Sequence, residues 1–337
     1  MKAALLYEKD DMRIVDVPVP TVGPKDILLK VRAAKVCPTD IRKYRLGSKD
    51  HSVRSLPMNL CHEWTGEVVE VGAEVTTIKK GNRLLGMGMA GNAEYVKIEG
   101  RLLDTPAPSV PGRPTPGTSR IVELPDNVSY EEGTFIVPLS ENMHSVLDQA
   151  GCKFGDTIVI AGAGSMGLMQ TNVARWTGAT VITTDLNESR LALAKEFGAD
   201  YTINPSKENV IETVRKITGG NMADCAVSTL GNPVVIKQAI DVTRNSARIV
   251  IFGGAPTGTI MQFDPNDIHY TEKILIGCEG TGLPPYQHPE KRVQAARHIA
   301  KKRIPLEKIT TVMPMTDIIK AYEMIEKQQL VTAVLRP

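Results

Sequence analysis

Residues 157–185 read TIVIAGAGSMGLMQTNVARWTGATVITTD, an apolar run followed by a glycine turn, a helical segment and a second apolar run. The turn fits G-x-G-x-x-G. Its first glycine allows a tight turn, its second lets a pyrophosphate approach the backbone, and its third lets the helix pack close to the strand. The residues of the turn are Gly162, Ala163, Gly164, Ser165, Met166 and Gly167. The second run ends in Asp185, where a carboxylate accepts hydrogen bonds from an adenosine ribose. The stretch predicts the start of a dinucleotide-binding fold; a glycine turn that only packs helix against strand is the alternative.

The segment that follows continues the same alternation of strand and helix. Strands are predicted at 157–161, 179–184, 200–203, 224–229, 248–253 and 273–278, and helices at 139–150, 189–197, 208–217 and 233–243. This order indicates a doubly wound sheet of six parallel strands, the Rossmann arrangement. Ligands bind at the carboxyl ends of the strands in such sheets, so Gly253 and Glu279-Gly280-Thr281 are expected to border a nicotinamide.

Length and composition suit an enzyme with small partners. A chain of 337 residues is long enough for two domains. A net charge of +2 leaves no electrostatic signature for nucleic acid or a membrane surface, so we expect a small-molecule substrate and neither of those partners. No apolar run approaches the roughly 18 residues of a membrane span, and Met1-Lys2-Ala3-Ala4 leads into a strand pattern, so we expect a cytoplasmic protein.

The first hundred residues are rich in short strands. These are predicted at 3–7, 13–17, 27–34, 67–71, 83–85 and 94–98, separated by Gly, Pro and Asp. Such spacing suggests a folded-over sheet or partial barrel. Near the end of the chain, a helix at 289–302, a short strand, a helix at 316–328 and a terminal strand at 332–335 complete the pattern.

Two groups of potential metal ligands lie within the strand-rich region. Cys37 stands in Val-Cys-Pro-Thr-Asp, and His62 and Glu63 follow Cys61. A thiolate, an imidazole and a carboxylate are ligand types that zinc accepts, and a catalytic zinc site has three of them plus an open position. Taken singly, each has a plainer interpretation: a core cysteine, a core histidine and a solvated charge. The five cysteines lie far apart, which does not suggest a disulfide framework.

His62 and Glu63 begin the pattern H-E-x-x-G-x-x-x-x-x-G-x-x-V, which continues through Gly66, Gly72 and Val75. With Cys37 upstream and the glycine turn downstream, it resembles the zinc-dependent medium-chain dehydrogenase/reductase family, in particular its polyol (sorbitol) and threonine dehydrogenase branch. The resemblance runs over nearly the whole chain. It implies an α/β protein with a GroES-like β-rich catalytic domain (1–138 and 285–337) and a Rossmann NAD-binding domain (139–284).

The resemblance also implies roles for single residues. Cys37 and His62 match the ligands of the catalytic zinc, and Glu63 a ligand or close partner. Thr39 matches the hydroxyl that bonds the substrate oxygen, and Asp40 the carboxylate that orients the histidine, as metal-bound imidazoles commonly require. In the cofactor domain, Arg190 stands where relatives hold the adenosine ribose with a cation.

Four departures from the family pattern bear on the site. Cys61 replaces the usual glycine before His-Glu, so a second thiol is expected near the metal. Val137 stands where relatives carry glutamate or cysteine, and Arg42 where they often carry a proton-relay histidine. The closely spaced cysteines of a structural zinc lobe do not occur between Cys61 and Cys152, which predicts one zinc per chain. A Pro-rich segment at 103–119 suggests a surface loop, with a lid or an intersubunit arm as the alternative.

The sequence therefore predicts an oxidoreductase that transfers hydride from a secondary alcohol, such as a polyol, sugar derivative or hydroxylated metabolite, to NAD with one catalytic zinc. A homodimer or homotetramer is expected from the resemblance. Two other functions remain open. One is a zinc-free quinone or alkene reductase of the same superfamily, and the other is a non-catalytic nucleotide-binding protein.

Overall fold

The computed structural model describes residues 1–86, 88–100, 122–256, 258–278 and 289–337, and it divides the chain into two compact units. The first unit comprises Met1–Val137 and Pro284–Pro337, and the second Pro138–Leu283. The Pro-rich segment at 103–119 and Glu279-Gly280-Thr281 lie outside the described residues. In the part of the chain that is described, no helix is both long and apolar enough to cross a membrane.

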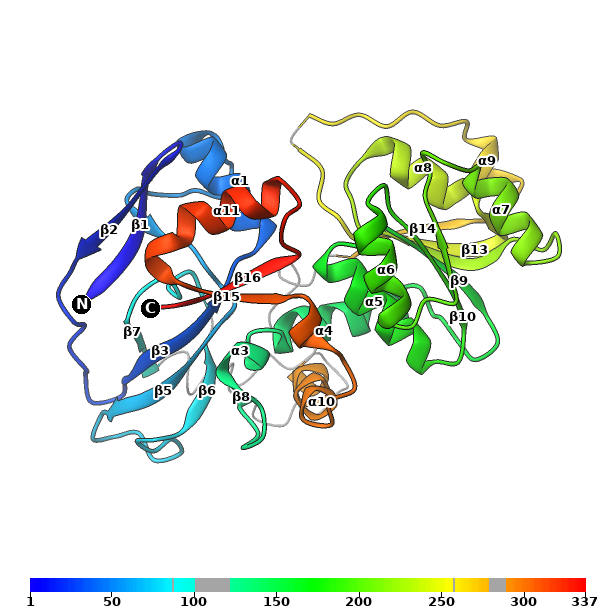
Figure 1. The fold of residues 1–337 in the computed structure, drawn as a ribbon. Helices are drawn as coiled ribbons and strands as arrows, with labels where there is room; N and C mark the ends of the chain where they lie inside the picture. The colour runs from blue at the N-terminus through cyan, green and yellow to red at the C-terminus, as the bar shows by residue number, and fades with distance from the viewer. Residues whose placement is uncertain (87, 101–121, 257, 279–288) are drawn as a thin grey trace. The chain divides into compact units, whose positions relative to one another are not determined.

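The first unit is built on a seven-stranded sheet with the order β15-β16-β3-β5-β6-β8, in which β7 also pairs with β3 (Figure 1). A separate sheet has the order β2-β1-β4. The strands are β1 (Lys2–Glu8), β2 (Asp11–Asp16), β3 (Ile27–Lys35), β4 (Met58–Asn59), β5 (Trp64–Val71), β6 (Arg83–Gly86), β7 (Tyr95–Ile98), β8 (Val122–Glu123), β15 (Thr310–Pro314) and β16 (Thr332–Arg336). The described helices are α1 (Pro38–Leu46), α3 (Tyr130–Gly133), α10 (Pro289–Ala300) and α11 (Ile318–Glu326), with α4 (Ile136–Met143) crossing into the second unit.

Strand β3 places the segment that carries Cys37. It pairs along its length with β5, while its other edge pairs first with β7 and then, at Ala34 and Lys35, with the terminal strand β16. The backbone N–H of Val36 continues this contact by donating to Ala333 at 2.9 Å. The end of the chain thus returns to β3 beside Cys37.

Two glycines of the His-Glu pattern stand where the backbone has close neighbours. A Cβ atom on Gly66 would lie 2.6 Å from the Lys30 carbonyl oxygen, and one on Gly72 would lie 2.2 Å from that of Gly23. Both contacts are shorter than any side chain tolerates, so a larger residue at Gly66 would push β5 away from β3, and one at Gly72 would displace the segment before β3. Val75, the last residue of the pattern, packs against the core of the same unit.

The second unit contains a six-stranded sheet with the order β11-β10-β9-β12-β13-β14, and every pair in it is parallel (Figure 1). Its strands are β9 (Thr157–Ala161), β10 (Thr180–Thr184), β11 (Tyr201–Ile203), β12 (Ala223–Ser228), β13 (Thr243–Ile251) and β14 (Ile274–Gly277). Its helices are α5 (Ser165–Trp176), α6 (Glu188–Glu196), α7 (Val210–Ile217), α8 (Pro233–Asp241) and α9 (Asn266–His269). The strand order reverses at β9, so the doubly wound parallel sheet predicted from the sequence is confirmed.

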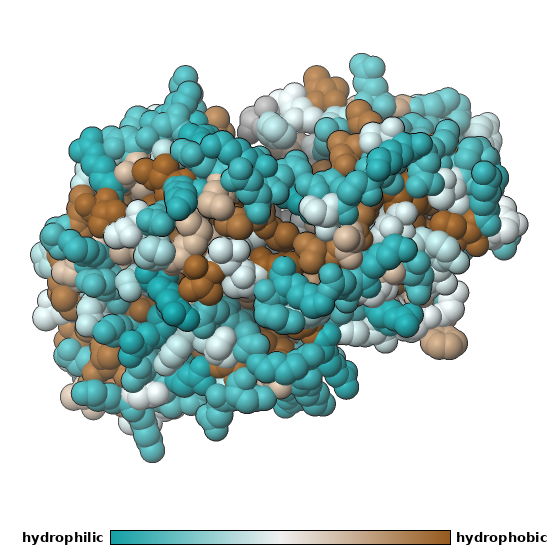
Figure 2. Space-filling model, in the orientation of Figure 1, coloured by the Kyte–Doolittle hydropathy of each residue, from teal (hydrophilic) through white to brown (hydrophobic). Residues whose placement is uncertain are grey.

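Two boundaries differ from the expectation. Strand β13 begins at Thr243, before the predicted Arg248, because helix α8 already ends at Asp241. The predicted helix at 139–150 is an α-helix only to Met143 and continues as a π-helix, His144–Gln149. Polar and apolar residues are interspersed over the face drawn in Figure 2.

Candidate metal centre and cofactor-binding turn

Cys37 stands at the N-terminus of α1, a helix that the sequence analysis did not predict. It is the N-cap residue, with an extended backbone (φ −104°, ψ 144°), and Pro38 fills the first helical position, where no N–H is required. Asp40, at the third position, accepts the backbone N–H of Cys37 through Oδ2 at 3.2 Å. This contact is one half of a capping box, and it fixes the start of the helix that carries the thiol.

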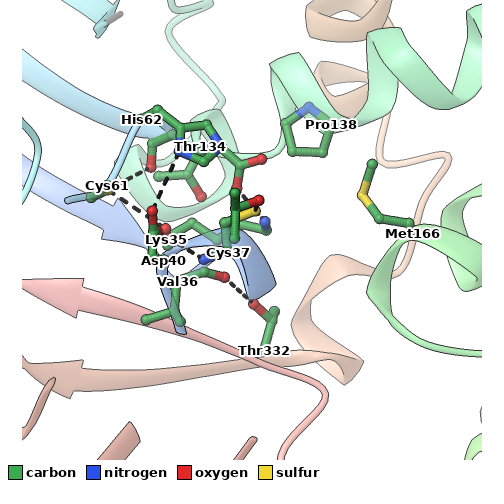
Figure 3. Close-up of polar contacts among 12 residues, drawn as sticks. Lys35, Val36, Cys37, Asp40, Cys61, His62, Thr134, Pro138, Met166 and Thr332 are labelled. Atoms are coloured by element: carbon green, nitrogen blue, oxygen red, sulfur yellow. Dashed lines mark hydrogen bonds and ion pairs between the residues drawn. The ribbon is translucent and has the colours of Figure 1, made fainter. Parts of the chain in front are cut away.

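His62 reaches the same place from the loop before β5. Its Nδ1 lies 3.5 Å from Oδ1 of Asp40, and the histidine side chain is 23% exposed whereas that of Asp40 is 1% exposed. Figure 3 shows Asp40 and His62 directed toward each other. Both atoms are buried, and neither has another hydrogen-bond partner among the described residues. The contact leaves the opposite ring nitrogen of His62 available to a metal.

Cys37, His62 and Glu63 offer one ligand atom each, and these atoms all lie within 4.8 Å of one another. The structure therefore brings together the three residues that the sequence predicted as metal ligands. A thiolate, an imidazole and a carboxylate in one cluster fit zinc, and the buried Asp40 carboxylate supplies the outer partner that a metal-bound imidazole needs. Three protein ligands would leave the fourth coordination position of a bound zinc to a substrate.

Lys35 is a member of this site that the sequence analysis missed. The ammonium of Lys35 forms an ion pair with the carboxylate of Glu63, and the side chains are only 1% and 5% exposed. The backbone N–H of Lys35 also donates to the Glu63 carbonyl at 2.8 Å. A signal was present in the sequence: Lys35 follows two apolar residues, Ala33 and Ala34, at the end of a strand and stands two residues before Cys37.

In the metal-free site, neighbouring acidic groups favour the charged forms of Lys35 and His62. Burial lowers the pKa of Lys35, but Glu63, Cys37 and Asp40 outweigh it and raise that pKa above its ordinary value. Burial likewise lowers the pKa of His62, while Asp40 and Cys37 raise it to about 11. A metal binding to this imidazole must displace a proton, so metal affinity rises with pH.

Cys61 is directed away from the metal cluster. Its Sγ contacts the carbonyl oxygens of Lys35 and Glu63, each at 3.6 Å, and the residue adopts a positive φ of 60°. Burial raises the pKa of this thiol well above its ordinary value. The described cluster of potential metal ligands does not include Cys61. The second thiol therefore lies beside the cluster, against the backbone of Glu63, and is not one of its three potential ligands.

Thr39 and Arg42 lie further along α1. The Thr39 hydroxyl is 3.2 Å from Sγ of Cys37, and the residue is half-buried. Arg42 donates from Nε to Oδ2 of the buried Asp50 at 2.7 Å, which ties the helix to the loop that follows it. Val137, where relatives carry an acid or a thiol, is buried as part of the core.

The glycine turn of the second unit has the geometry that its sequence predicted. Gly162 has a φ of +109°, in the left-handed region that favours glycine. A Cβ atom on Gly167 would lie 1.8 Å from the Gly162 carbonyl oxygen, whereas one on Gly164 would meet nothing within 4 Å. The space beside Gly164, at the N-cap of α5, suits the close approach of a phosphate. Ser165 and Met166 form the first turn of that helix.

Asp185 follows β10 and is held against the turn. Its Oδ2 accepts the backbone N–H of Ala163 at 2.7 Å, and its Oδ1 accepts that of Asn187 at 2.8 Å. A carboxylate has further lone pairs, so both oxygens remain able to accept ribose hydroxyls. Arg190 lies in the first turns of α6, and a Cβ atom on Gly253 would lie 2.4 Å from the Thr229 carbonyl oxygen. The predicted cofactor residues thus surround the carboxyl ends of β9, β10 and β13.

Two family models match the chain. The alcohol dehydrogenase GroES-like domain matches residues 23–118, and the zinc-binding dehydrogenase domain matches residues 165–296. Sorbitol dehydrogenase 1 of Saccharomyces cerevisiae is 34% identical over 340 residues, covering 95% of this chain and 93% of the yeast protein. L-Threonine 3-dehydrogenase of Symbiobacterium thermophilum is 32% identical and covers 89% of this chain and 90% of its own length.

A solved structure shows the same likeness. The crystal structure of 2R,3R-butanediol dehydrogenase from Bacillus subtilis superposes with a TM-score of 0.83 at 26% identity. The superposition covers 100% of this chain and 99% of the other. The likeness therefore extends over both units and is not confined to the dinucleotide-binding fold.

Proposed function

The chain belongs to the zinc-dependent alcohol dehydrogenase family, and from that premise we propose that it oxidises a secondary alcohol to the ketone with NAD as the hydride acceptor. The proposed substrate is a polyol, a sugar derivative or another hydroxylated metabolite. The observation that carries the proposal is the cluster of Cys37, His62 and Glu63, whose ligand atoms all lie within 4.8 Å of one another. A dehydrogenase without zinc would have no use for these three side chains in one place.

Residues of the first unit have different roles at the reacting hydroxyl. When bound, zinc polarises the substrate oxygen and NAD accepts the hydride. Cys37, His62 and Glu63 would hold the ion, and Asp40 fixes the orientation of the histidine ring. The half-buried Thr39 hydroxyl, 3.2 Å from the Cys37 sulfur, accepts the substrate proton and passes its own proton to solvent.

The second unit supplies cofactor recognition. Gly164 leaves room for the pyrophosphate at the start of α5, whose backbone N–H groups face the phosphates. Asp185 accepts the ribose hydroxyls and repels a 2′-phosphate, so NAD is preferred over NADP. Arg190 favours the opposite preference, because a cation near the ribose tolerates the 2′-phosphate of NADP.

We also propose that the chain forms a homodimer or homotetramer. Strand β14 is an edge strand of the described sheet, and its first residue, Ile274, is 45% exposed. Open strand edges with apolar side chains favour pairing with another chain. Light scattering on the purified protein measures the assembly directly, and a monomeric mass at micromolar concentration would rule the proposal out.

The decisive experiment is a substrate screen with the zinc-loaded protein. Polyols, amino alcohols and simple secondary alcohols are each mixed with NAD, and the formation of reduced nicotinamide is followed by absorbance. We expect turnover with at least one secondary alcohol and none with Cys37→Ser. Bound zinc without alcohol-dependent reduction of NAD would indicate a non-catalytic binding protein. Reduction of quinones or activated alkenes by the zinc-free chain would indicate the reductase.

A further inference from the structure

The ion pair between Lys35 and Glu63 lies inside the candidate metal centre. Lys35 ends β3, and its ammonium also lies 5.5 Å from the centre of the Phe135 ring. Both charged side chains are almost fully buried, so water does not screen the lysine charge. The Glu63 carboxylate that contacts Lys35 is the same group that stands within reach of Cys37 and His62.

Glu63 therefore pairs with the Lys35 ammonium and also belongs to the cluster that would hold a metal. A carboxylate that already neutralises an ammonium attracts a second cation less strongly, and a buried ammonium also repels a divalent ion at short range. Without a metal, the ammonium prevents Glu63 from being a buried charge with no partner, which proteins rarely tolerate.

We propose that Lys35 is a built-in counter-cation of Glu63: it stabilises the metal-free site and limits how tightly zinc is held. Lys35 is thus a positioning residue that acts through Glu63. The proposal rests on Cys37, His62 and Glu63 being the metal ligands, but it does not depend on which alcohol the chain oxidises. It predicts a zinc that exchanges more readily than the three ligands alone would allow.

The test compares zinc affinity in charge-removing variants, measured by competition with a chromophoric chelator. Lys35→Met removes the charge and keeps most of the side-chain volume. Lys35→Gln also removes the charge but keeps an N–H that can donate to Glu63, and it serves where Lys35→Met does not fold without metal. We expect both variants to bind zinc more tightly, by about 10-fold or more, the scale on which outer partners tune a metal site. Lys97→Gln, which breaks an ion pair with Asp26 in the same unit, is the matched control and should leave the affinity unchanged.

Thermal unfolding and a double-mutant cycle separate this role from a merely structural one. The metal-free Lys35→Met protein should unfold at a lower temperature than wild type, and zinc should raise its Tm by more. In a Glu63→Gln background, Lys35→Met should change zinc affinity less than it does in the wild-type chain, because the shared carboxylate charge is gone.

The results that overturn the proposal are distinct from those that overturn the function. Unchanged zinc affinity in both Lys35 variants, with equal losses of Tm in the metal-free and zinc-bound forms, would make the ion pair purely structural. Weaker zinc binding would mean that Lys35 holds Glu63 in place for the metal instead of competing with it. Failure of the wild-type chain to bind zinc would overturn the proposed function as well.

Discussion

Oδ1 of Asp40 lies 3.5 Å from Nδ1 of His62, while Oδ2 of the same carboxylate accepts the backbone N–H of Cys37 at 3.2 Å. One buried side chain thus orients a proposed histidine ligand and caps the helix that carries the thiol. The two proposed ligands are 25 residues apart in the sequence, as their numbers show, and Asp40 is the residue that contacts both. Its substitution should therefore affect the metal more than the fold.

Asp40→Asn should weaken zinc binding by about 10- to 100-fold, because the imidazole loses the charged partner that fixes its orientation. The amide oxygen still accepts the Cys37 N–H, so the helix start should persist. Zinc affinity is measured by chelator competition, and circular dichroism checks the fold. Asp16→Asn, which changes an exposed carboxylate of the same unit, is the control. Equal affinities for Asp40→Asn and wild type would show that the contact with His62 has no bearing on the metal.

Cys37→Ser and Cys61→Ala should have opposite consequences. Cys37→Ser should lose zinc and activity while NAD binding persists, because the glycine turn belongs to the other unit. Cys61→Ala should keep its zinc and lose stability, on the order of 1 kcal/mol, because its buried sulfur fills space beside two carbonyl groups. Metal content after dialysis and Tm are the two measurements. Complete zinc loss from Cys61→Ala would place that thiol among the ligands.

The chain should bind one zinc. The closely spaced cysteines that hold a structural zinc in many relatives do not occur in the sequence between Cys61 and Cys152. Elemental analysis of dialysed protein gives the stoichiometry, and Cys37→Ser should reduce it to near zero. A value near two per chain would contradict the interpretation that the region from Gly86 to Ser119 lacks a structural zinc lobe.

NAD should be used with a higher kcat/KM than NADP, and Asp185→Asn should bring the two values closer together. The substitution removes the negative charge that opposes a 2′-phosphate but keeps an oxygen that accepts the Ala163 N–H. Asp200→Asn changes another carboxylate that accepts a backbone N–H, at Val181, and should leave the ratio unchanged. Equal efficiency of the wild-type enzyme with both cofactors would contradict the proposed role of Asp185.

Asp50 should stabilise the first unit at neutral pH and lose this effect in acid. Burial raises its pKa, but hydrogen bonds from Ser52 and the ion pair with Arg42 lower it to about 2, below the ordinary value of 3.8. Because the pKa is lower in the folded state, the stabilisation is present above about pH 4 and disappears as the pH falls toward 2. Asp50→Asn should lower the free energy of unfolding by about 2 kcal/mol at pH 7 and by roughly half as much at pH 3.

The measurement follows the fluorescence of the buried Trp64 during denaturation of metal-free protein. A Trp176→Phe background removes the only other tryptophan of the chain. A difference between Asp50→Asn and its parent that stays constant from pH 7 to pH 3 would show that the carboxylate is not held in its charged form by Arg42.

Much of the fold was predictable because it is encoded by neighbouring residues. The glycine turn, the acid at Asp185 and the alternation of strand and helix were sufficient to predict the six-stranded parallel sheet, which the structure confirms. Errors arose where local signals competed. The helix α1 was not predicted, although Pro38 and Asp40 occupy its first and third positions. Strand β13 begins at Thr243, earlier than the predicted start at Arg248.

The sequence by itself determined which residues can bind a metal and a dinucleotide, because ligand chemistry and glycine spacing are properties of short segments. Only the tertiary structure decided which of them meet. It brought Cys37 beside His62 and Glu63, turned Cys61 toward two backbone carbonyls and placed the ammonium of Lys35 against Glu63. These contacts depend on the register between β3 and β5 and on where α1 begins. The register is set by packing across the whole sheet, so no local pattern around Cys37 or His62 contains it.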